Sequence, residues 1–245
     1  MSAPPTNPPV VSVIVPVRNE AGNIAPLVEE IAAALADRRF EVVYVKDGST
    51  DGTEAALNAL RVEHPWLRQV KHAQSCGQSA ALRTGIRAAR GHTIVTLDGD
   101  GQNDPVFLPK LIDALEQGAP RVGLIAGQRV GRKATGFKKF QSRVANAVRG
   151  SILKDGTRDS GCGLKAFPRE VGLALPYFDG LHRFLPALVR REGKDIGYVD
   201  VVDRPRQHGV SNYGFWDRLW IGILDLAGVW WLIRRRKRVP DISEV

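Results

Sequence analysis

The chain has 245 residues, of which 43% are hydrophobic and 25% charged, so it can form one large α/β domain, or a domain and a tail, with a real core. Its two cysteines, Cys76 and Cys162, exclude a disulfide framework and a cysteine-based zinc site. The net charge is +9, and basic clusters without an acid lie at 129–149 and 234–238. These clusters favour anionic partners, namely phosphates, nucleic acid or a membrane surface, over a merely solvated surface.

The first residues, MSAPPTNPPV, have neither the charged region nor the apolar region of a signal peptide. We expect residues 1–9 to be a short, proline-rich, disordered lead-in. We also expect both cysteines to remain free thiols in a reducing compartment.

Strand-like and helical segments then alternate along the chain. The β-branched apolar run 10–17 predicts a buried parallel strand, and apolar residues at helical spacing predict a helix over 22–37. The alternation continues with expected strands at 40–47, 69–72, 92–98 and 122–129, and expected helices at 51–64, 77–91 and 104–118. This order predicts a mostly parallel, doubly wound sheet, in which ligands bind at the carboxyl ends of the strands.

After residue 130 the pattern changes. We expect a basic amphipathic helix from about 137 to 153, a glycine-rich turn over 157–167, a helix near 181–192 and a strand near 197–203.

The segment 219–233 contains fifteen residues with one acid, Asp225, and basic residues follow it. A spanning helix needs roughly 20 apolar residues. Three tryptophans beside an Arg/Lys cluster instead predict an amphipathic helix in the membrane interface. A helix packed on the domain and a true membrane span are the alternatives.

Polar residues follow three of the expected strands, in PVRNE (16–20), KDGSTDGT (46–53) and LDGDGQ (97–102). Asp98 and Asp100 are spaced so that both carboxylates can enter one crevice, and Gly99 and Gly101 permit the backbone turns between them. Hard oxygen ligands in this pattern suit Mg²⁺ or Mn²⁺ bound to a diphosphate, with Gln102 as a neutral ligand or a holder of metal-bound water.

Asp104 has a different expected role. It precedes Pro105 at the start of the helix expected to end at Gly118, and an aspartate N-cap followed by proline is a common helix start. The other common site motifs are absent, including GxGxxG, the Walker loop, GxSxG and HExxH, and the five histidines do not have ligand spacing.

Four segments, VSVIVPVRNE, VKDGSTDGT, LDGDGQNDP and DSGCGLKAF, resemble the inverting family 2 glycosyltransferases of the GT-A fold. The likeness is greatest to the dolichol-phosphate-mannose synthase-like branch, which loads a sugar onto a polyprenyl phosphate. RPRQHGVSNYG (204–214) looks like that branch's Arg-x-x-Gly-x-Ser-Lys region. The resemblance covers about residues 10–214 in the right order, with a donor half to about 128, an acceptor half from 129 and a tail over 215–245.

The resemblance implies roles for the matching residues. Asp47 would contact the nucleotide base, and Asp98, Asp100 and Gln102 would hold the metal and the donor's ribose or diphosphate. The expected catalytic residues are Asp100, Arg206 at the donor diphosphate and Arg129 near the acceptor phosphate. Pro16, Glu20 and Gly77 would complete the donor site, and Lys138, Lys139, Arg143, Asp159 and Ser211 the acceptor site.

Three positions depart from the family pattern. Lys46 replaces the first acid of the usual DDGS, Cys76 replaces an asparagine before the third helix, and Asn212 replaces the lysine of the Ser-Lys pair. Lys46 suggests a donor with an acidic sugar. Asp159 has an alternative role, in which it stabilises its turn by accepting from the amides of SGCG (160–163).

The expected reaction moves a sugar from a UDP- or GDP-sugar to a polyprenyl phosphate at the cytoplasmic face of the inner membrane. The acceptor phosphate has a second pKa near ~6, so it is mostly a dianion at neutral pH and needs no strong general base. The reaction instead requires stabilisation of the negative charges on the leaving diphosphate and the acceptor phosphate, which a metal, Arg206 and the basic stretch 129–149 would supply.

Several alternatives stay open. The acceptor could be another component of the cell envelope rather than a prenyl phosphate, and the protein could form a homo-oligomer or bind a membrane protein. A polysaccharide synthase is disfavoured because Gln-x-x-Arg-Trp is absent, and a nucleotidyltransferase because the GGxGxR loop is absent. A non-enzymatic basic protein on the membrane surface would not explain the carboxylates at the strand ends, and we expect no nucleic-acid partner.

Overall fold

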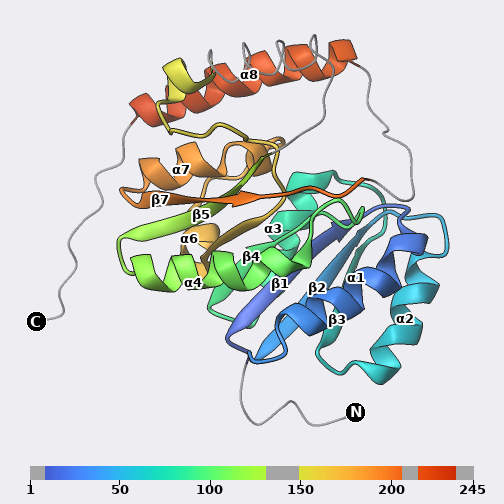
Figure 1. The fold of residues 1–245 in the computed structure, drawn as a ribbon. Coiled ribbons are helices and arrows are strands. Elements are labelled where there is room, and N and C mark those ends of the chain that lie inside the picture. Colours follow the sequence, from blue (N-terminus) through green and yellow to red (C-terminus); the bar gives the residue numbers. More distant parts are fainter. Residues whose placement is uncertain (1–8, 131–148, 206–214, 236–245) are drawn as a thin grey trace, which may run out of the picture.

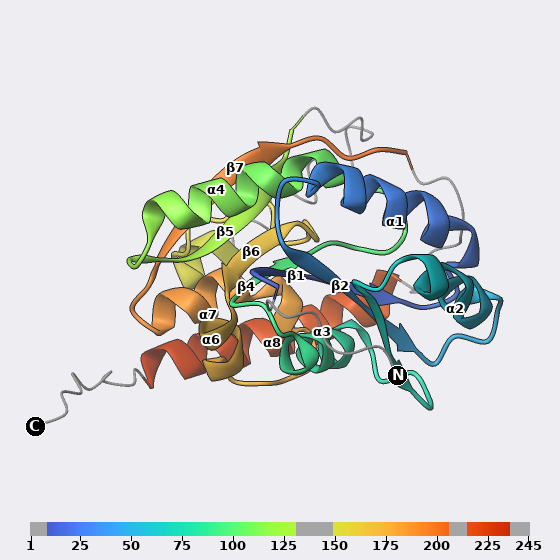
Figure 2. The ribbon, with the colours of Figure 1, turned by 90° about the horizontal axis from the view of Figure 1, so that it is seen from below.

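A computed structural model describes residues 9–130, 149–205 and 215–235, with side chains left out over 215–221. The chain forms three layers, in which helices cover both faces of a central sheet (Figures 1 and 2). The sheet has seven strands in the order β3-β2-β1-β4-β6-β5-β7. They are β1 (Val11–Val17), β2 (Phe40–Asp47), β3 (Leu67–His72), β4 (Thr93–Thr96), β5 (Val122–Arg129), β6 (Lys165–Pro168) and β7 (Asp195–Val201).

The strands expected from the sequence are all present and pair in parallel, as predicted for a doubly wound sheet. In the β1–β2 register Val13 is opposite Val42, and in the β1–β4 register Ile14 is opposite Thr96. The glycine-rich segment 157–167 was expected to be a turn, but its end enters the sheet as β6, which is antiparallel to β4 and β5. Unlike the equally short β4, its residues KAFP include lysine, alanine and proline and no β-branched residue, so the sequence did not reveal it.

The described helices lie on both faces of the sheet. They are α1 (Ala21–Ala34), α2 (Thr53–Glu63), α3 (Gln78–Ala88), η1 (Pro105–Phe107), α4 (Leu108–Gly118), α6 (Arg169–Ala174), η2 (Leu181–Arg183), α7 (Leu185–Arg191) and α8 (Phe215–Arg234). In Figure 2, α1, α2 and α4 lie on one face of the sheet and α3, α6, α7 and α8 on the other. The helix expected over 137–153 lies mostly outside the described residues.

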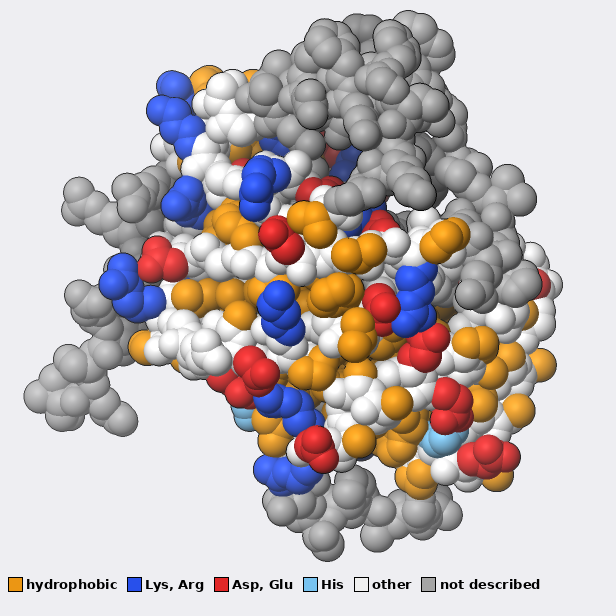
Figure 3. All heavy atoms as spheres, in the orientation of Figure 1, with side chains coloured by type: hydrophobic (Ala, Val, Ile, Leu, Met, Phe, Trp, Pro, Cys, Tyr) orange, Lys and Arg blue, Asp and Glu red, His pale blue; other side chains and the backbone are white. Residues whose placement is uncertain are grey.

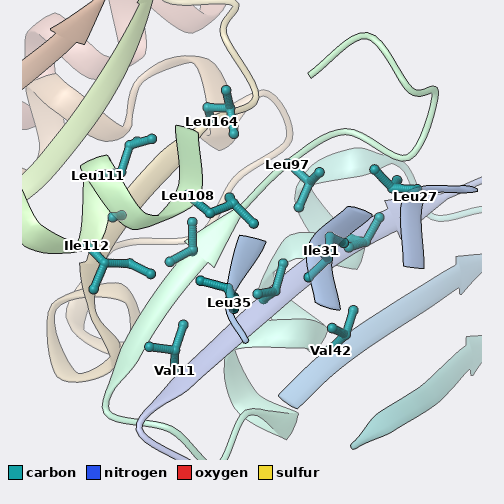
Figure 4. Close-up of a cluster of buried hydrophobic side chains, with 14 of the residues drawn as sticks. Val11, Leu27, Ile31, Leu35, Val42, Leu97, Leu108, Leu111, Ile112 and Leu164 are labelled. Atoms are coloured by element: carbon teal, nitrogen blue, oxygen red, sulfur yellow. The ribbon is translucent and has the colours of Figure 1, made fainter. Parts of the chain in front are cut away.

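Each face of the sheet buries its own apolar cluster. Figure 4 shows the first, in which Leu27 and Ile31 of α1 and Leu35, directly after this helix, meet Leu108 and Ile112 of α4 over the strands. A spacing of four residues places these side chains on one side of the helix, which is the reason it packs there. On the outer side of α1 and α4, acidic and basic side chains are interspersed, as in an ordinary solvated surface (Figure 3).

The C-terminal helix α8 packs on α7, as the alternative of a docked helix predicted (Figure 1). Val229 is buried in the second apolar cluster, and the backbone carbonyl of Leu232 accepts from Arg191 Nε at 3.1 Å. Ile223, Leu224 and Trp231 are nevertheless exposed. Within the described parts of the chain, we find no helix with both the length and the hydropathy of a membrane span. Whether the exposed side of α8 lies in a membrane interface stays a prediction.

Candidate active site

The loops after β1 and β2 are joined at the carboxyl edge of the sheet. The backbone N–H of Thr50 donates to Asn19 Oδ1 at 2.8 Å, and the backbone N–H of Asn19 donates to Ser49 Oγ at 3.1 Å. Asp51 then accepts from the backbone of Ala21 at 3.2 Å, at the start of α1. These bonds fix the PVRNE and KDGSTDGT segments against each other, as expected for parallel strands that end at one edge.

Asp98 is the second residue after β4 and is held from two directions. Its carboxylate accepts from Gln78 Nε2, at the first residue of α3, with a distance of 2.8 Å to Oδ1. Its backbone N–H donates to Asn103 Oδ1 at 2.9 Å. Asp100 follows in the same loop and accepts from the backbone of Gln102 at 3.1 Å. The three residues expected to hold a metal therefore lie in one tight loop.

The electrostatics of this loop fit a divalent cation. Burial, and next the negative charge of Asp100, raise the pKa of Asp98 to about 6. A carboxylate whose ionisation is opposed by burial and by a neighbouring carboxylate suits Mg²⁺ or Mn²⁺, because the cation removes the repulsion and prefers oxygen ligands. The residues present therefore fit the expected metal.

The two glycines of the loop serve different purposes. Gly101 has φ = +74°, so it makes the backbone turn that the sequence predicted. Gly99 is needed for packing instead, because a Cβ there would lie 2.2 Å from Val17 Cγ1 on β1. Gly163 is equally constrained, since its Cβ would meet Asp98 Oδ2 at 2.5 Å. The close approach of the 160–163 turn to Asp98 thus requires glycine.

Asp104 caps the following helical segment, as predicted. Its Oδ1 accepts from the backbone of Val106 at 3.0 Å, at the start of η1. The same oxygen lies 2.6 Å from Arg204 Nη2, and Arg204 N–H donates to the carbonyl of Gln102 at 2.8 Å. Asp104 therefore links the metal-binding loop to the segment after β7.

Asp47, expected at the nucleotide base, is buried at the end of β2 and organises the loop before α3. Its carboxylate accepts from the backbone N–H of Cys76 at 2.7 Å and Gly77 at 2.9 Å. It also accepts from Ser75 Oγ at 2.8 Å and faces His72 Nδ1 at 2.7 Å. Burial opposes ionisation, but these hydrogen bonds outweigh it and lower the pKa of Asp47. Contact with a base stays a prediction.

Asp47, His72 and Cys76 also bring ligand atoms within 4.8 Å of one another. This group is better explained as structure than as a metal site. The other nitrogen of the His72 ring faces Thr84 Oγ1 at 2.9 Å, so both ring nitrogens already have partners. Each Asp47 oxygen already has two hydrogen-bond partners, which leaves little capacity for a metal.

Arg129, at the end of β5, is bound by two carboxylates. Its Nε and Nη2 donate to Asp159 at 2.5 and 2.7 Å, and its Nη1 donates to Asp203 Oδ2 at 3.1 Å. Burial works against both charges, but the pairing raises the pKa of Arg129 and lowers that of Asp159. Both groups are therefore ionised at neutral pH, and contact of Arg129 with an acceptor phosphate stays a prediction.

Asp159 also accepts from the backbone of Gly161 at 3.3 Å, which confirms the turn-stabilising contact with the SGCG segment. Arg149, counted in the basic stretch, is likewise not a free charge. It is buried and donates two hydrogen bonds to Asp155, at 3.0 and 2.5 Å. Basic residues that are consecutive in sequence are therefore partly neutralised in the fold.

Lys46 does not have the role suggested for it as the determinant of an acidic sugar. It is buried, and its ammonium lies 2.5 Å from Glu54 Oε2 on α2. Lys46 and Asp47 are adjacent on β2, so their side chains point to opposite faces of the sheet. Glu54 neutralises Lys46 there.

The remaining predicted residues divide into two groups. Pro16 lines a cavity with Asp98 and Gln78, and Glu20 accepts from Asn23 Nδ2 at 2.6 Å. The second group lies outside the described residues and consists of Arg206, Lys138, Lys139, Arg143, Ser211 and Asn212.

Five residues of the site were not identified from the sequence. Gln78, Asn103 and Asp203 act on Asp98 or Arg129 through the contacts above, and Lys165 and Arg183 line the same cavity as Asp98. Asn103 and Lys165 lie within the quoted segments LDGDGQNDP and DSGCGLKAF, and Gln78 directly follows Gly77, so a local signal was available for these three. Asp203 and Arg183 lie outside the quoted segments and carry no local pattern.

Comparison with known proteins points to one family. Residues 12–172 match the model of Glycosyl transferase family 2. The chain is 38% identical to dodecaprenyl-phosphate galacturonate synthase of Rhizobium johnstonii over 95% of this chain and 71% of the relative. It is 33% identical to undecaprenyl-phosphate 4-deoxy-4-formamido-L-arabinose transferase of Aeromonas hydrophila, over 84% of this chain and 63% of that relative.

The chain thus spans less than two thirds of the length of the second relative. Among solved structures, it superposes on glucosyl-3-phosphoglycerate synthase of Mycobacterium tuberculosis, in complex with Mn²⁺, UDP-glucose and glycerol 3-phosphate, with a TM-score of 0.67. The sequence identity is 21%, and the superposition covers 95% of this chain and 82% of the other. At this identity the likeness shows a shared fold.

Proposed function

The chain belongs to Glycosyl transferase family 2, and on that premise we propose that it transfers a sugar, with inversion, from a nucleotide diphosphate sugar to a polyprenyl phosphate. The observation that carries the proposal is the Asp98/Asp100 loop at the carboxyl edge of the sheet, fixed by Gln78 and Asn103. Both relatives above are named for transfer to a polyprenyl phosphate, which supports this acceptor.

The donor side of the reaction requires charge stabilisation. Asp98 and Asp100, with Gln102, would hold Mg²⁺ or Mn²⁺, which neutralises charge on the departing nucleotide diphosphate. Gln78 and Asn103 keep Asp98 in a fixed orientation through bonds of 2.8 and 2.9 Å, so the carboxylate needs no rearrangement during transfer.

The acceptor side requires a phosphate oxygen aimed at the sugar, and not a strong base, because the phosphate is already largely ionised. Asp159 stays ionised beside Arg129 and is fixed by three of its N–H groups. We propose that Asp159 orients the acceptor and that Arg129 limits its repulsion of the phosphate. Lys138, Lys139, Arg143 and Ser211 are proposed as further contacts of the acceptor phosphate, and Arg206 as a contact of the donor diphosphate.

We also propose that the protein associates with the cytoplasmic face of the membrane through α8. Arg234 lies 4.4 Å from the centre of the Trp230 ring and Arg235 lies 5.5 Å from that of Trp231, which pairs aromatic and basic groups as membrane interfaces favour. A cavity of about 430 Å³ is lined by Trp230 and by four basic residues, namely Lys154, Arg190, Arg191 and Arg234. Such a surface suits anionic headgroups.

The reaction is tested by incubating the protein with Mn²⁺, polyprenyl phosphate and a panel of UDP- and GDP-sugars, with products identified by mass. A glycosylated polyprenyl phosphate is expected with at least one donor. Product on a phosphorylated acceptor without a prenyl chain, and none on polyprenyl phosphate, would contradict the proposed acceptor.

Membrane association is tested by sedimentation with vesicles that contain anionic lipid. The double variant Leu224→Glu/Trp231→Glu changes two exposed residues of α8 and should lower the bound fraction. Val62→Glu, at a still more exposed residue of α2, should not. Unchanged binding of the double variant would place the attachment elsewhere.

A further inference from the structure

A cavity of about 130 Å³ opens beside Asp98, on the side of the sheet covered by α3. Its walls come from segments far apart in the chain. They include the first turn of α3, the glycine-rich turn before β6, and η2. The ionisable side chains that line it are Asp98, Cys162, Lys165, His182 and Arg183.

Lys165 is the most unusual of these residues, because it is 5% exposed and carries an amine. Its ammonium donates to the backbone carbonyl of Cys162. Among the described residues, no carboxylate oxygen lies within 4.0 Å of this ammonium, which is the distance limit of an ion pair. A buried cation without a counter-ion is costly, and burial indeed lowers the pKa of Lys165. A buried ionisable group with a strongly shifted pKa that lines a cavity marks a candidate ligand site.

Arg183 presents a second incomplete cation to the cavity. Its Nη2 donates to Asp225 of α8 at 3.0 Å, but its Nε is buried and has no hydrogen-bond partner among the described residues. Arginine binds carboxylates best through two N–H groups at once, and here only one is used. The cavity is therefore lined by Lys165, which has no carboxylate partner among the described residues, and by Arg183, which uses one N–H on Asp225.

The other lining groups compensate these charges only in part, because the charge of Asp98 raises the pKa of Lys165 by less than burial lowers it. Burial, and next the charges of Lys165 and Arg183, lower the pKa of His182 to about 3, so its ring is neutral and faces Ser79 Oγ at 2.9 Å. Burial raises the pKa of the Cys162 thiol to about 11, so it carries no charge at neutral pH. Asp98 is the acid of the cavity, and it is proposed to bind the metal.

Resting on the proposed function, we infer that this cavity receives the sugar of the donor and that Lys165 and Arg183 bind a carboxylate on it. The substrate class is then a nucleotide-diphosphate uronate, in which the carboxylate replaces the neutral CH₂OH group at C6. A uronate supplies the missing counter-ion, whereas a neutral hexose leaves Lys165 buried and unpaired. This assigns to Lys165 the discrimination that Lys46, already paired with Glu54, cannot provide.

The experiment compares UDP-galacturonate with UDP-galactose, which differ at C6 alone, in the presence of Mn²⁺ and polyprenyl phosphate. The wild-type kcat/KM should favour the uronate by at least about 100-fold, because a site built to bind a polar group discriminates strongly against its absence. The Lys165→Met variant should reduce this ratio by at least about 30-fold, Lys165→Arg should retain most of it, and Arg183→Gln should reduce it by about tenfold.

Two controls accompany the variants. Arg61→Gln removes an exposed arginine of α2 and should leave the ratio unchanged. Thermal melting tests folding, and Lys165→Met should melt at or above the wild-type temperature because it replaces an unpaired buried charge by an apolar chain. If Lys165→Met does not fold, the effect of Arg183→Gln on the ratio tests the inference in its place.

Binding of both UDP-sugars, measured by calorimetry without acceptor, separates this inference from the proposed function. Tighter binding of the uronate to wild type, lost in Lys165→Met, supports the inference even if polyprenyl phosphate is not the acceptor. Transfer of galactose to polyprenyl phosphate at least as fast as galacturonate would overturn the inference and leave the proposed function intact. An equal loss for both donors in Lys165→Met would also overturn it, because Lys165 would then serve the diphosphate.

Discussion

Arg129 and Asp159 are joined side by side, with Nε–Oδ2 and Nη2–Oδ1 distances of 2.5 and 2.7 Å. Asp203 binds the remaining end of the guanidinium at 3.1 Å. A cation held by two acids is electrically satisfied before any substrate arrives. Arg129 therefore orients Asp159 in this structure, and the acceptor phosphate must draw on other basic residues as well.

Replacing Asp159 by asparagine should lower the free energy of unfolding by about 2 kcal/mol, because hydrogen bonds to charged groups are lost in a largely buried place. If Asp159 orients the acceptor, kcat/KM should fall by at least about 100-fold, more than the stability loss would explain. Denaturant unfolding and initial rates measure the two effects. Asp203→Asn, which leaves the Arg129–Asp159 pair intact, is the matched control, and an equal rate loss there would remove the special role of Asp159.

The Asp100→Ala variant should lose transfer by at least about 100-fold, or ~2.7 kcal/mol of transition-state stabilisation, and remain folded. Its melting temperature without metal should equal or exceed that of wild type, because the charge of Asp100 opposes ionisation of the half-buried Asp98. Turnover close to wild type would contradict the metal role of this loop.

Mn²⁺ should raise the melting temperature of wild type, since a ligand at 100 times its Kd stabilises a folded protein by about 2.7 kcal/mol. The rise should disappear in Asp98→Asn and Asp100→Ala but persist in Cys76→Ser. Loss of the effect in Cys76→Ser alone would move the metal to the Asp47, His72 and Cys76 group.

Replacing Asp104 by alanine should cost about 1 kcal/mol of stability through the lost cap of η1. The rate of transfer should change by less than about threefold, because Asp104 supports the loop without contacting the metal. Chemical denaturation and initial rates test this, with Asp113→Ala, an acid within α4, as the control. A rate loss as large as that of Asp100→Ala would place Asp104 in the reaction itself.

Stability should depend on pH through His182, whose pKa burial lowers to about 3 in the folded protein. Between about pH 6.5 and 3 the unfolded chain binds a proton that the folded chain does not, so stability falls as the pH falls, by up to about 1.4 kcal/mol per pH unit. Above that window the contribution is fully present. The His182→Gln variant should show a shallower acid-side slope in denaturant unfolding, and an unchanged slope would contradict the assignment.

Much of the fold follows from local sequence. The apolar runs of β1, β2 and β5 and the helical spacing in α1 are complete within their own segments, so the elements and their parallel order could be predicted. The same holds for the carboxylates of Asp98 and Asp100 and for the cap at Asp104, because a strand end and a helix start are local features.

The tertiary structure alone decided how charges are paired and which polar groups are buried. β6 pairs with β4 and β5, and the sequence of its own four residues does not indicate these partners. In the sequence, Arg129 is 30 residues from Asp159 and 74 residues from Asp203, so only the packing of the strands brings the three together. Likewise, Lys165 loses its solvent because distant segments close over it, whereas its own sequence, GLKAF, shows an ordinary lysine. Burial and ion pairing depend on contacts between distant residues, and a linear pattern does not encode those contacts.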